Sequence, residues 1–338
     1  MANLVVGKNS SGKSRTLHAF GIVKSVLSQR YSKEDKFNFD SEIVFIDNKG
    51  HELSLSLSIN GQKVLKEILK VDGVVKIYRS GPSGRIEDEV VNPPEDMLLM
   101  HVRRDVAKYD YIEEIISWAE NTVIRSFIDC DSPSQSELFD IVSKFTPVMK
   151  HNVINMANEV GFPLRELDTF DNIFKNFKKK SSNSDSEGIM IRFIILNEKN
   201  VGYLTLNELS SGMYRTLLLL ILIEQLRNLD YPALLAIDDL GEGLDYSRAT
   251  KVGKKLFEIC EEKKVQVIAT SNEEFMMNIV DISKWNILVR KGNVVKSITS
   301  DFCPDEFEEF KFSGLSNFDF FTSDFLNGIS SKLFRKKK

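Results

Sequence analysis

The feature that most constrains this chain is the run Gly-Lys-Asn-Ser-Ser-Gly-Lys-Ser at residues 7–14. It matches the phosphate-loop pattern G-x-x-x-x-G-K-[ST] without a mismatch. Glycines in such a loop allow tight turns, so that successive backbone N–H groups point at phosphate oxygens. The apolar run 4–6 predicts a buried strand before the loop, and helical spacing after Ser11 predicts a helix that aims its positive end at the same anion. A glycine-rich turn without a ligand is the alternative.

The loop supplies most of the candidate ligands. Lys13 is the candidate that reaches the β- and γ-phosphates and is also a candidate catalytic residue. The Ser14 hydroxyl is the candidate Mg²⁺ ligand. The cofactor-binding residues expected here are Gly7, Asn9, Ser10, Ser11, Gly12, Lys13, Ser14 and Arg15.

The composition is that of an ordinary soluble protein. The 338 residues are 42% hydrophobic and 28% charged, enough for one large domain or two lobes. The net charge of −4 gives no global basic field that would attract nucleic acid. Three scattered cysteines (Cys130, Cys260 and Cys303) indicate neither a disulfide framework nor a cysteine-based metal site. With no signal-peptide pattern and no apolar run longer than 217–223, we expect a cytoplasmic protein without membrane contact.

Residues 37–78 change to a period of two. Apolar side chains alternate there with serines, which predicts a half-buried strand; they are Leu53, Leu55, Leu57 and Ile59. Asn60-Gly61 and Asp72-Gly73 predict two-residue hairpin turns. Together they indicate an antiparallel meander.

The middle of the chain changes to helical spacing. A further strand is expected at 98–102, a helix at 111–127 and one long amphipathic helix over about 135–160, which Gly161 ends. We therefore expect a helical lobe inserted between two parts of an α/β core.

A low-complexity stretch follows at 175–188, with lysines at its start. It is interpreted as a solvated surface loop, with a nucleic-acid contact as the alternative. Two strands are expected after it, at 189–197 and 203–206.

The turn before the predicted helix 214–229 forms a second candidate anion site. That helix is apolar on several faces, which predicts that it is buried. Its N-terminus would then hold Ser210, Ser211 and Gly212 rigidly at the tip, where an anion could bind. The alternative is a capping sequence, with Ser210 as N-cap and no ligand.

Two adjacent carboxylates end the predicted buried strand at 233–237. The carboxyl ends of parallel strands are where α/β sheets place their ligands. Asp238 is the candidate that holds Mg²⁺, and Asp239 the candidate that orients or deprotonates the attacking water. The next apolar strand, 265–269, ends in Thr270-Ser271-Asn272. Ser271 is a candidate catalytic residue that senses the γ-phosphate, with a helix cap as the alternative.

The order of these motifs resembles an ABC-type ATPase head. It is closest to the AAA-family branch that includes the OLD-like, SMC-related ATPases of bacteria. Residues 7–14 resemble the Walker A loop, ELSSGMYRTL at 208–217 resembles the signature motif, and LLAIDDLGEGLD at 234–245 resembles a Walker B strand, catalytic carboxylate and D-loop. The resemblance covers roughly residues 1–300.

The resemblance implies a P-loop α/β fold with a mixed sheet, an antiparallel β subdomain and an inserted helical lobe. Four segments are expected: 1–105, the Walker A core and antiparallel β lobe; 106–205, the helical lobe with its loop 175–188; 206–300, the signature helix, Walker B and remaining core; and 301–338, a Phe-rich tail.

The resemblance also implies an ATP–Mg²⁺ sandwich. Two protomers would pack head to tail as a homodimer, or within a larger oligomer. Lys13 and Ser14 of one copy would hold the nucleotide that Ser210 and Gly212 of the other cover, with Asp245 at the interface.

Three departures from the family pattern predict slow hydrolysis. Asp239 stands where the family has its catalytic glutamate, and Glu242 is a nearby substitute. Ser271, beside Asn272, stands where the family has its switch histidine. No glutamine loop is evident, although Arg103 and Arg104 lie in that region of the sequence.

The tail is rich in phenylalanine and acidic residues over 302–325. It is interpreted as docking on the core, with a partner-binding arm as the alternative. It is too short for the nuclease domain of OLD enzymes, so the expected function is an ATPase switch for a separate effector protein, in anti-phage defence. The alternatives are an SMC-like DNA-repair ATPase, a transporter subunit and a non-hydrolysing nucleotide-binding scaffold. A nucleic-acid partner stays open.

Overall fold

The computed structural model describes residues 2–31, 35–47, 49–127, 135–174, 189–229, 233–262 and 265–322, with Ile329 and Phe334. The chain divides into two compact units. One comprises Met1–Leu17, Val123–Asp230 and Leu234–Lys338; the other comprises His18–Thr122 and Tyr231–Ala233. The loop expected at 175–188 lies outside the described residues.

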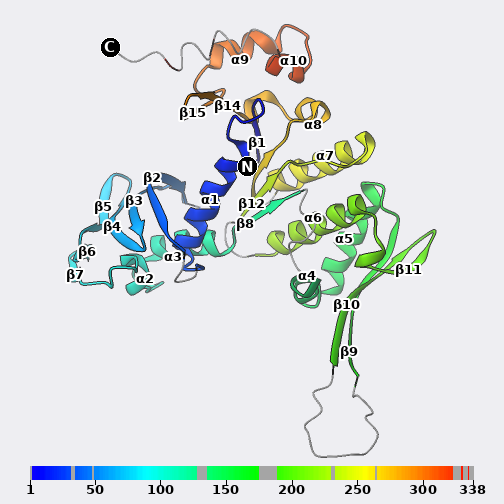
Figure 1. The fold of residues 1–338 in the computed structure, drawn as a ribbon, viewed down its shortest axis with the longest axis horizontal. Coiled ribbons are helices and arrows are strands. Elements are labelled where there is room, and N and C mark those ends of the chain that lie inside the picture. The colour runs from blue at the N-terminus through cyan, green and yellow to red at the C-terminus, as the bar shows by residue number, and fades with distance from the viewer. Residues whose placement is uncertain are drawn as a thin grey trace, which may run out of the picture. The chain divides into compact units, whose positions relative to one another are not determined.

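A mixed six-stranded sheet forms the centre of the first unit, in the order β15-β14-β1-β13-β12-β8 (Figure 1). β1 pairs in parallel with β13 and β14, β8 in parallel with β12, and β15 antiparallel to β14. The strands are β1 (Ala2–Val6), β8 (Val123–Ser126), β12 (Ala233–Asp238), β13 (Val265–Thr270), β14 (Trp285–Lys291) and β15 (Val294–Ile298). The predicted strands at 4–6, 233–237 and 265–269 are confirmed. Their continuous apolar runs suit strands that are buried on both faces.

Helices follow the strands that carry the sequence motifs. α1 (Lys13–Leu27) begins inside the P-loop motif, and α6 (Ser211–Arg227) begins inside the signature-like motif. α7 (Tyr246–Glu262) and α8 (Glu274–Ile279) follow β12 and β13. Nine consecutive residues of α6, from 216 to 224, are buried, so the prediction of a buried helix is confirmed.

The single long helix expected at 135–160 is wrong. The structure has two helices, α4 (Gln135–Val142) and α5 (Pro147–Glu159). Pro147 has no N–H to donate and clashes with the preceding turn, so it starts a helix rather than continuing one. The Thr146 hydroxyl caps α5 by accepting a 3.3 Å hydrogen bond from the Met149 N–H.

The helix expected at 111–127 is correct only in its first part. α3 (Asp110–Glu120) ends early, and the chain then forms strand β8 of the central sheet. Val123 and Ile124 pair with β12, so tertiary pairing decides the conformation of this short apolar run.

The strand expected at 98–102 is also wrong, because Leu99–Val102 is a single helical turn, α2. Its free N–H groups at Leu99 and Met100 donate to the Glu67 carboxylate, at 2.6 and 3.1 Å. This buried carboxylate stabilises a helical start that no local pattern indicated.

A three-stranded antiparallel sheet lies beside α4 and α5. It contains β9 (Leu164–Phe174), β10 (Ile189–Glu198) and β11 (Gly202–Thr205), in the order β11-β10-β9. Figure 1 shows β9 and β10 projecting from these helices as a two-stranded arm. The strands expected at 189–197 and 203–206 are confirmed, whereas β9 was not expected.

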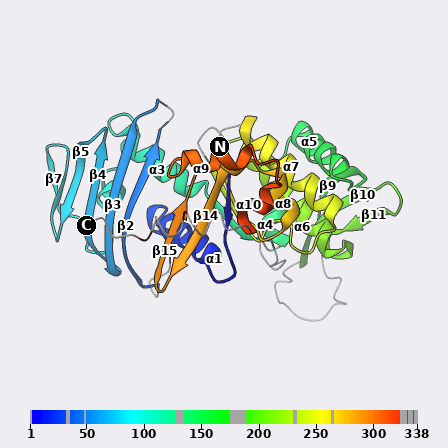
Figure 2. The same ribbon diagram turned by 90° about the horizontal axis from the view of Figure 1, so that it is seen from above.

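The second unit carries the predicted meander. Its strands are β2 (Phe37–Ile46), β3 (Glu52–Gly61), β4 (Lys63–Val71), β5 (Val74–Ser80), β6 (Gly84–Ile86) and β7 (Glu89–Val91), side by side in chain order (Figure 2). The alternating apolar side chains of β3 are buried, as predicted. Asp72-Gly73 forms the expected turn, with φ of 47° and 79°. The other turn lies one residue later than expected, since Asn60 pairs with Lys63.

The C-terminal segment packs on the core. α9 (Pro304–Lys311) and α10 (Asn317–Thr322) bury Phe307, Phe310 and Phe320. The Asn317 amide donates to the Val280 carbonyl at 2.9 Å, which ties α10 to the end of α8. Docking, the first of the two expected alternatives, therefore holds for 304–322. Across the described part of the chain, no helix combines the length and apolar character needed to cross a membrane.

Candidate functional site

The P-loop connects β1 to α1, and its shape depends on residue size and on positive φ. A Cβ at Gly7 would lie 2.3 Å from the Ser11 Oγ and 3.1 Å from the Leu288 carbonyl, so only glycine fits. Ser10 and Gly12 have φ of 65° and 110°, conformations that turn the loop back on itself. Lys8, Asn9 and Ser10 are exposed, as are Ser14 and Arg15 in the first turn of α1.

Lys13 is buried within this loop. Its ammonium donates a 3.0 Å hydrogen bond to the Gly7 carbonyl, and only 8% of the residue is exposed. Burial lowers the pKa of Lys13, and the carboxylates of Asp239 and Asp238 oppose that shift. The ammonium therefore lies in the field of the two aspartates, as the motif order predicted. In the same loop, the buried Ser11 hydroxyl has no hydrogen-bond partner in the described structure, and it lies against Gly7.

Thr270 connects the two aspartates at the end of β12. Its hydroxyl donates a 2.5 Å hydrogen bond to Asp238 Oδ1, and its Oγ1 accepts the Asp239 N–H at 2.8 Å. Asp238 pairs with Ser126 of β8, and its carbonyl accepts the Phe127 N–H at 2.8 Å. The backbone of the acidic pair is thus fixed from both neighbouring strands.

Asp239 has an unusual backbone and an unusual carboxyl group. Its φ is 53°, in the left-handed region that non-glycine residues rarely adopt. Burial raises its pKa, Asp238 and Glu242 add to the rise, and Lys13 opposes it. A half-buried carboxylate with a raised pKa has the character of a proton acceptor for water.

Ser271 and Asn272, which end the strand expected to sense the γ-phosphate, have different partners. The buried Ser271 hydroxyl donates to the Leu240 carbonyl and accepts the Glu273 N–H, both at 3.1 Å. These bonds hold the turn that precedes α8. They are not the helix cap of the alternative interpretation, because the N-cap of α8 is Glu273 and no side chain caps that helix. Asn272 is exposed, and its amide donates to the Asn9 Oδ1 of the P-loop at 3.4 Å. Sequence reasoning selected Ser271, whereas the structure brings Asn272 to the loop.

The signature-like turn makes a different set of contacts. Ser210 is the N-cap of α6, and its Oγ accepts the Met213 N–H at 3.4 Å. A Cβ at Gly212 would lie 3.1 Å from the Leu244 side chain, and the Arg215 guanidinium donates to the Glu242 carbonyl at 3.2 Å. The turn therefore packs on the loop 241–245. Ser210 and Ser211 are exposed, and no hydrogen bond joins residues 210–212 to residues 7–15 in the described parts of the chain.

Asp245 and Arg104, one of the two arginines in the region where a glutamine loop was sought, have local partners. Asp245 immediately precedes α7, and its carboxylate accepts the Arg248 N–H at 3.0 Å while the residue stays exposed. Arg104 pairs with Glu113 at 2.5 Å and with Glu120 at 3.3 Å, within the second unit. These ion pairs give Arg104 a structural partner and lend no support to a role at the nucleotide.

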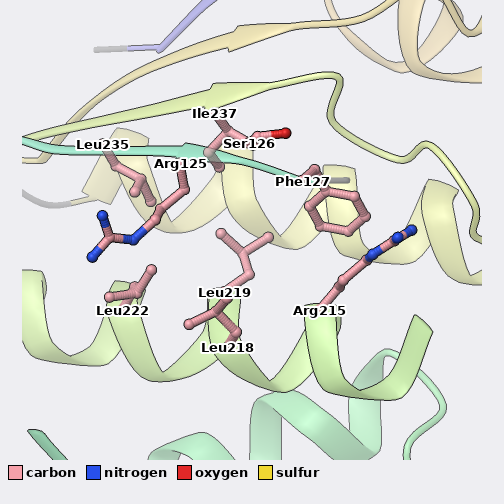
Figure 3. Close-up of a pocket in the computed structure, with 9 residues that line it drawn as sticks. All are labelled: Arg125, Ser126, Phe127, Arg215, Leu218, Leu219, Leu222, Leu235 and Ile237. Carbon is pink, nitrogen blue, oxygen red and sulfur yellow. The ribbon is translucent and has the colours of Figure 1, made fainter. Parts of the chain in front are cut away.

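Leucines of α6 hold the signature-like helix against β8 and β12. Figure 3 shows a small pocket between them, lined by Leu218, Leu219 and Leu222 below and by Leu235 and Ile237 above, with Arg125 and Arg215 at its ends. Arg125 pairs with Glu137 at 2.9 Å. The lining is mainly apolar, so this contact fixes the helix rather than adding a ligand site.

Comparisons with known proteins agree with this geometry. The family model described as "AAA domain, putative AbiEii toxin, Type IV TA system" matches residues 2–271. The chain belongs to this AAA-domain family. No curated protein matches it.

Solved structures similar to this AAA-domain chain include SMC heads. An SMC head bound to the C-terminal winged-helix domain of ScpA is 14% identical, with a TM-score of 0.51 over 87% of this chain and 89% of that one. The SMC head domain from Thermotoga maritima has 15% identity and a TM-score of 0.46, covering 88% of this chain and 89% of that one. With the P-loop and mixed sheet, the first match shows the fold of an ABC-type, SMC-related ATPase head, as the sequence resemblance predicted.

Two residues that contact the site were not predicted. Arg290 of β14 donates to the Ser10 carbonyl at 3.2 Å, and Thr270 links the aspartates. Arg290 lies outside every motif, so no sequence signal pointed to it. Thr270 was noted only as part of the polar end of a strand.

Proposed function

We propose that this AAA-domain head binds and slowly hydrolyses ATP with Mg²⁺, in two sites shared by a head-to-tail dimer. The supporting observation is that the chain separates the two halves of such a site. The P-loop lies in the field of Asp238 and Asp239, whereas the signature-like turn exposes Ser210 and Ser211 without a bond to that loop. An exposed helix N-terminus can bind an anion, and in the proposed dimer this anion is the phosphate held by the P-loop of the other copy.

The residues present suit Mg–ATP. The donor set at the loop comprises the Lys13 ammonium, the unpartnered Ser11 hydroxyl and the backbone N–H groups after the positive-φ glycine. Ser14 and Asp238 would hold the cation, which takes oxygen ligands and keeps several waters. When bound, Mg²⁺ would neutralise charge on the transferred phosphoryl group.

Asp239 would orient and deprotonate the attacking water. Its side chain is one methylene shorter than the family glutamate, so its reach to that water is reduced, and we expect slow turnover. Asn272, which contacts Asn9, takes the γ-phosphate-facing role in this proposal in place of Ser271, whose hydroxyl bonds to the backbone of Leu240 and Glu273.

The biological role proposed is a switch for a separate effector protein in bacterial anti-phage defence. The support for this role is the family description, which names an AbiEii toxin and a type IV toxin–antitoxin system. Slow hydrolysis would let bound ATP hold one conformation long enough to control a partner.

The test is the mass of the full chain in solution with Mg²⁺, with and without ATP. We expect ATP to produce a dimer that Asp239→Asn prolongs and Ser210→Arg abolishes. Ser313→Arg, which adds the same bulk and charge to an exposed position in another loop, should dimerise like the wild type.

Two outcomes would contradict parts of the proposal. If the mass is indifferent to ATP and to Ser210→Arg, the shared-site dimer is wrong. If the dimer forms but neither the wild type nor Asp239→Asn turns over ATP above background, the chain is a nucleotide-binding scaffold rather than an ATPase.

A further inference from the structure

The β14–β15 hairpin lies beside the P-loop. Val6, the last residue of β1, pairs in parallel with Ile287, so β14 continues past the point where β1 becomes the loop. The Leu288 carbonyl marks this contact, since it would lie 3.1 Å from a Cβ at Gly7. One side of the P-loop therefore lies against strand β14, which is not part of any nucleotide-binding motif.

Arg290 extends from β14 to the P-loop at Ser10. Its Nη1 donates to the Ser10 carbonyl at 3.2 Å, and its Nε donates to the Gly292 carbonyl of its own hairpin turn at 2.8 Å. The peptide between Ser10 and Ser11 is thus held at both polar atoms, because the Ser11 N–H donates to the Lys8 carbonyl at 2.9 Å. Ser10 has a φ of 65°, a conformation that a non-glycine residue keeps only where the surrounding structure fixes it.

Val295, on the other strand of this hairpin, lies close to a second part of the P-loop. It pairs with Arg290 across the hairpin, and its Cγ2 lies 3.4 Å from the position that a Cβ of Gly12 would occupy. Gly12 is the other positive-φ residue of the loop. One cross-strand pair therefore lies at both turning points of the P-loop: Arg290 donates a charge-assisted hydrogen bond to Ser10, and Val295 borders the space beside Gly12.

We propose that Arg290 and Val295 form a hairpin clamp that positions the P-loop for polyphosphate binding. The inference rests on the proposed nucleotide site and adds positioning residues to it. Arg290 acts through Ser10 and not on the nucleotide. The clamp fixes the direction of the loop N–H groups before the anion binds. The entropy lost by the loop on binding is therefore smaller.

The test measures the affinity of the full chain for MgATP and MgADP by calorimetry. We expect Arg290→Ala to weaken both about tenfold, the loss expected for one charge-assisted hydrogen bond. Arg290→Lys should recover part of the affinity, and Val295→Ser should weaken it less, by about threefold. Lys291→Ala is the matched control, because it removes the neighbouring cation of the same strand, whose ammonium contacts the Phe334 ring.

The outcomes distinguish a positioning role of Arg290 from a general loss of stability, and a failure of the clamp from a failure of the proposed function. A clamp predicts that Arg290→Ala and Lys291→Ala melt at similar temperatures while only the first loses affinity. Affinity of Arg290→Ala within a factor of about two of the control overturns the clamp, as does a loss that Arg290→Lys does not reduce. If the wild type binds neither nucleotide, the proposed function itself fails.

Discussion

The Thr270 hydroxyl donates to the Asp238 carboxylate at 2.5 Å, and its oxygen accepts the amide of the next aspartate at 2.8 Å. One buried side chain at the end of β13 thereby sets both the carboxylate proposed to hold Mg²⁺ and the backbone of the residue proposed to activate water. The φ of 53° at Asp239 is compatible with the fold because its N–H has this fixed acceptor.

We expect Thr270→Val to reduce both stability and turnover. Valine keeps the shape but leaves the Asp239 N–H without its acceptor, at a cost of about 1–3 kcal/mol. Thr270→Ser retains the hydroxyl and should behave much more like the wild type. Urea unfolding and ATP turnover measure the two effects. A Thr270→Val protein with wild-type turnover would show that the hydroxyl has no part in placing the carboxylates.

The length of the Asp239 side chain predicts a gain of function. Asp239→Glu restores the reach of the family glutamate and should raise ATP turnover about tenfold, equivalent to about 1.4 kcal/mol of barrier. Asp239→Asn should abolish turnover, whereas Glu242→Gln, at an exposed position, should not. Loss of turnover in Glu242→Gln but not in Asp239→Asn would make Glu242 the base.

Asp239 also predicts the pH dependence of turnover. Its carboxyl must be ionised to accept a proton, and its pKa is raised above the ordinary value. Activity should therefore fall as the pH is lowered, beginning above the range in which an ordinary aspartate titrates. Initial rates between pH 4 and 8, set against the nucleotide affinity at each pH, would separate this effect from a loss of binding. A rate that stays flat down to the ordinary pKa would contradict it.

Sequence reasoning located the site where chemistry and local pattern coincide. The P-loop, the acidic pair and the buried signature-like helix each need a particular residue order, and each was found. β8 was missed because Val123 and Ile124 form a strand only by pairing with β12. Arg290 was missed because its role depends on a hairpin returning to a loop some 280 positions earlier in the chain. Asn272 rather than Ser271 faces the P-loop because the Ser271 hydroxyl has two backbone partners that no sequence pattern reveals.

Glu67 predicts how the stability of the second unit depends on pH. Burial raises its pKa from 4.5 to about 7, although it accepts two backbone N–H groups and lies near Arg79. The folded state then binds the proton more tightly than the unfolded state. This stabilisation is complete below the unfolded pKa and is lost as the pH rises through about 7.

The free energy of unfolding should therefore fall by up to about 3 kcal/mol between pH 4.5 and 8 through this group. Urea unfolding of the wild type and Glu67→Gln across that range would measure it. The glutamine variant cannot titrate, so its curve should lack this component. Parallel curves for the two proteins would contradict the assignment.

Two phenylalanines of the C-terminal segment should differ sharply in their contribution to stability. Phe320 is fully buried, and its ring packs against those of Phe307 and Phe310, with centroids 4.8 and 4.6 Å apart. Phe312, which follows α9, is 87% exposed. Phe320→Ala removes a packed ring and leaves a cavity, so we expect a loss of about 3–5 kcal/mol. Phe312→Ala should change stability by no more than about 0.5 kcal/mol.

Thermal and urea unfolding of the two variants give the comparison, with ATP turnover recorded alongside. If Phe320→Ala were as stable as Phe312→Ala, the segment would not be docked on the core in solution, and its phenylalanines would be free to bind a partner.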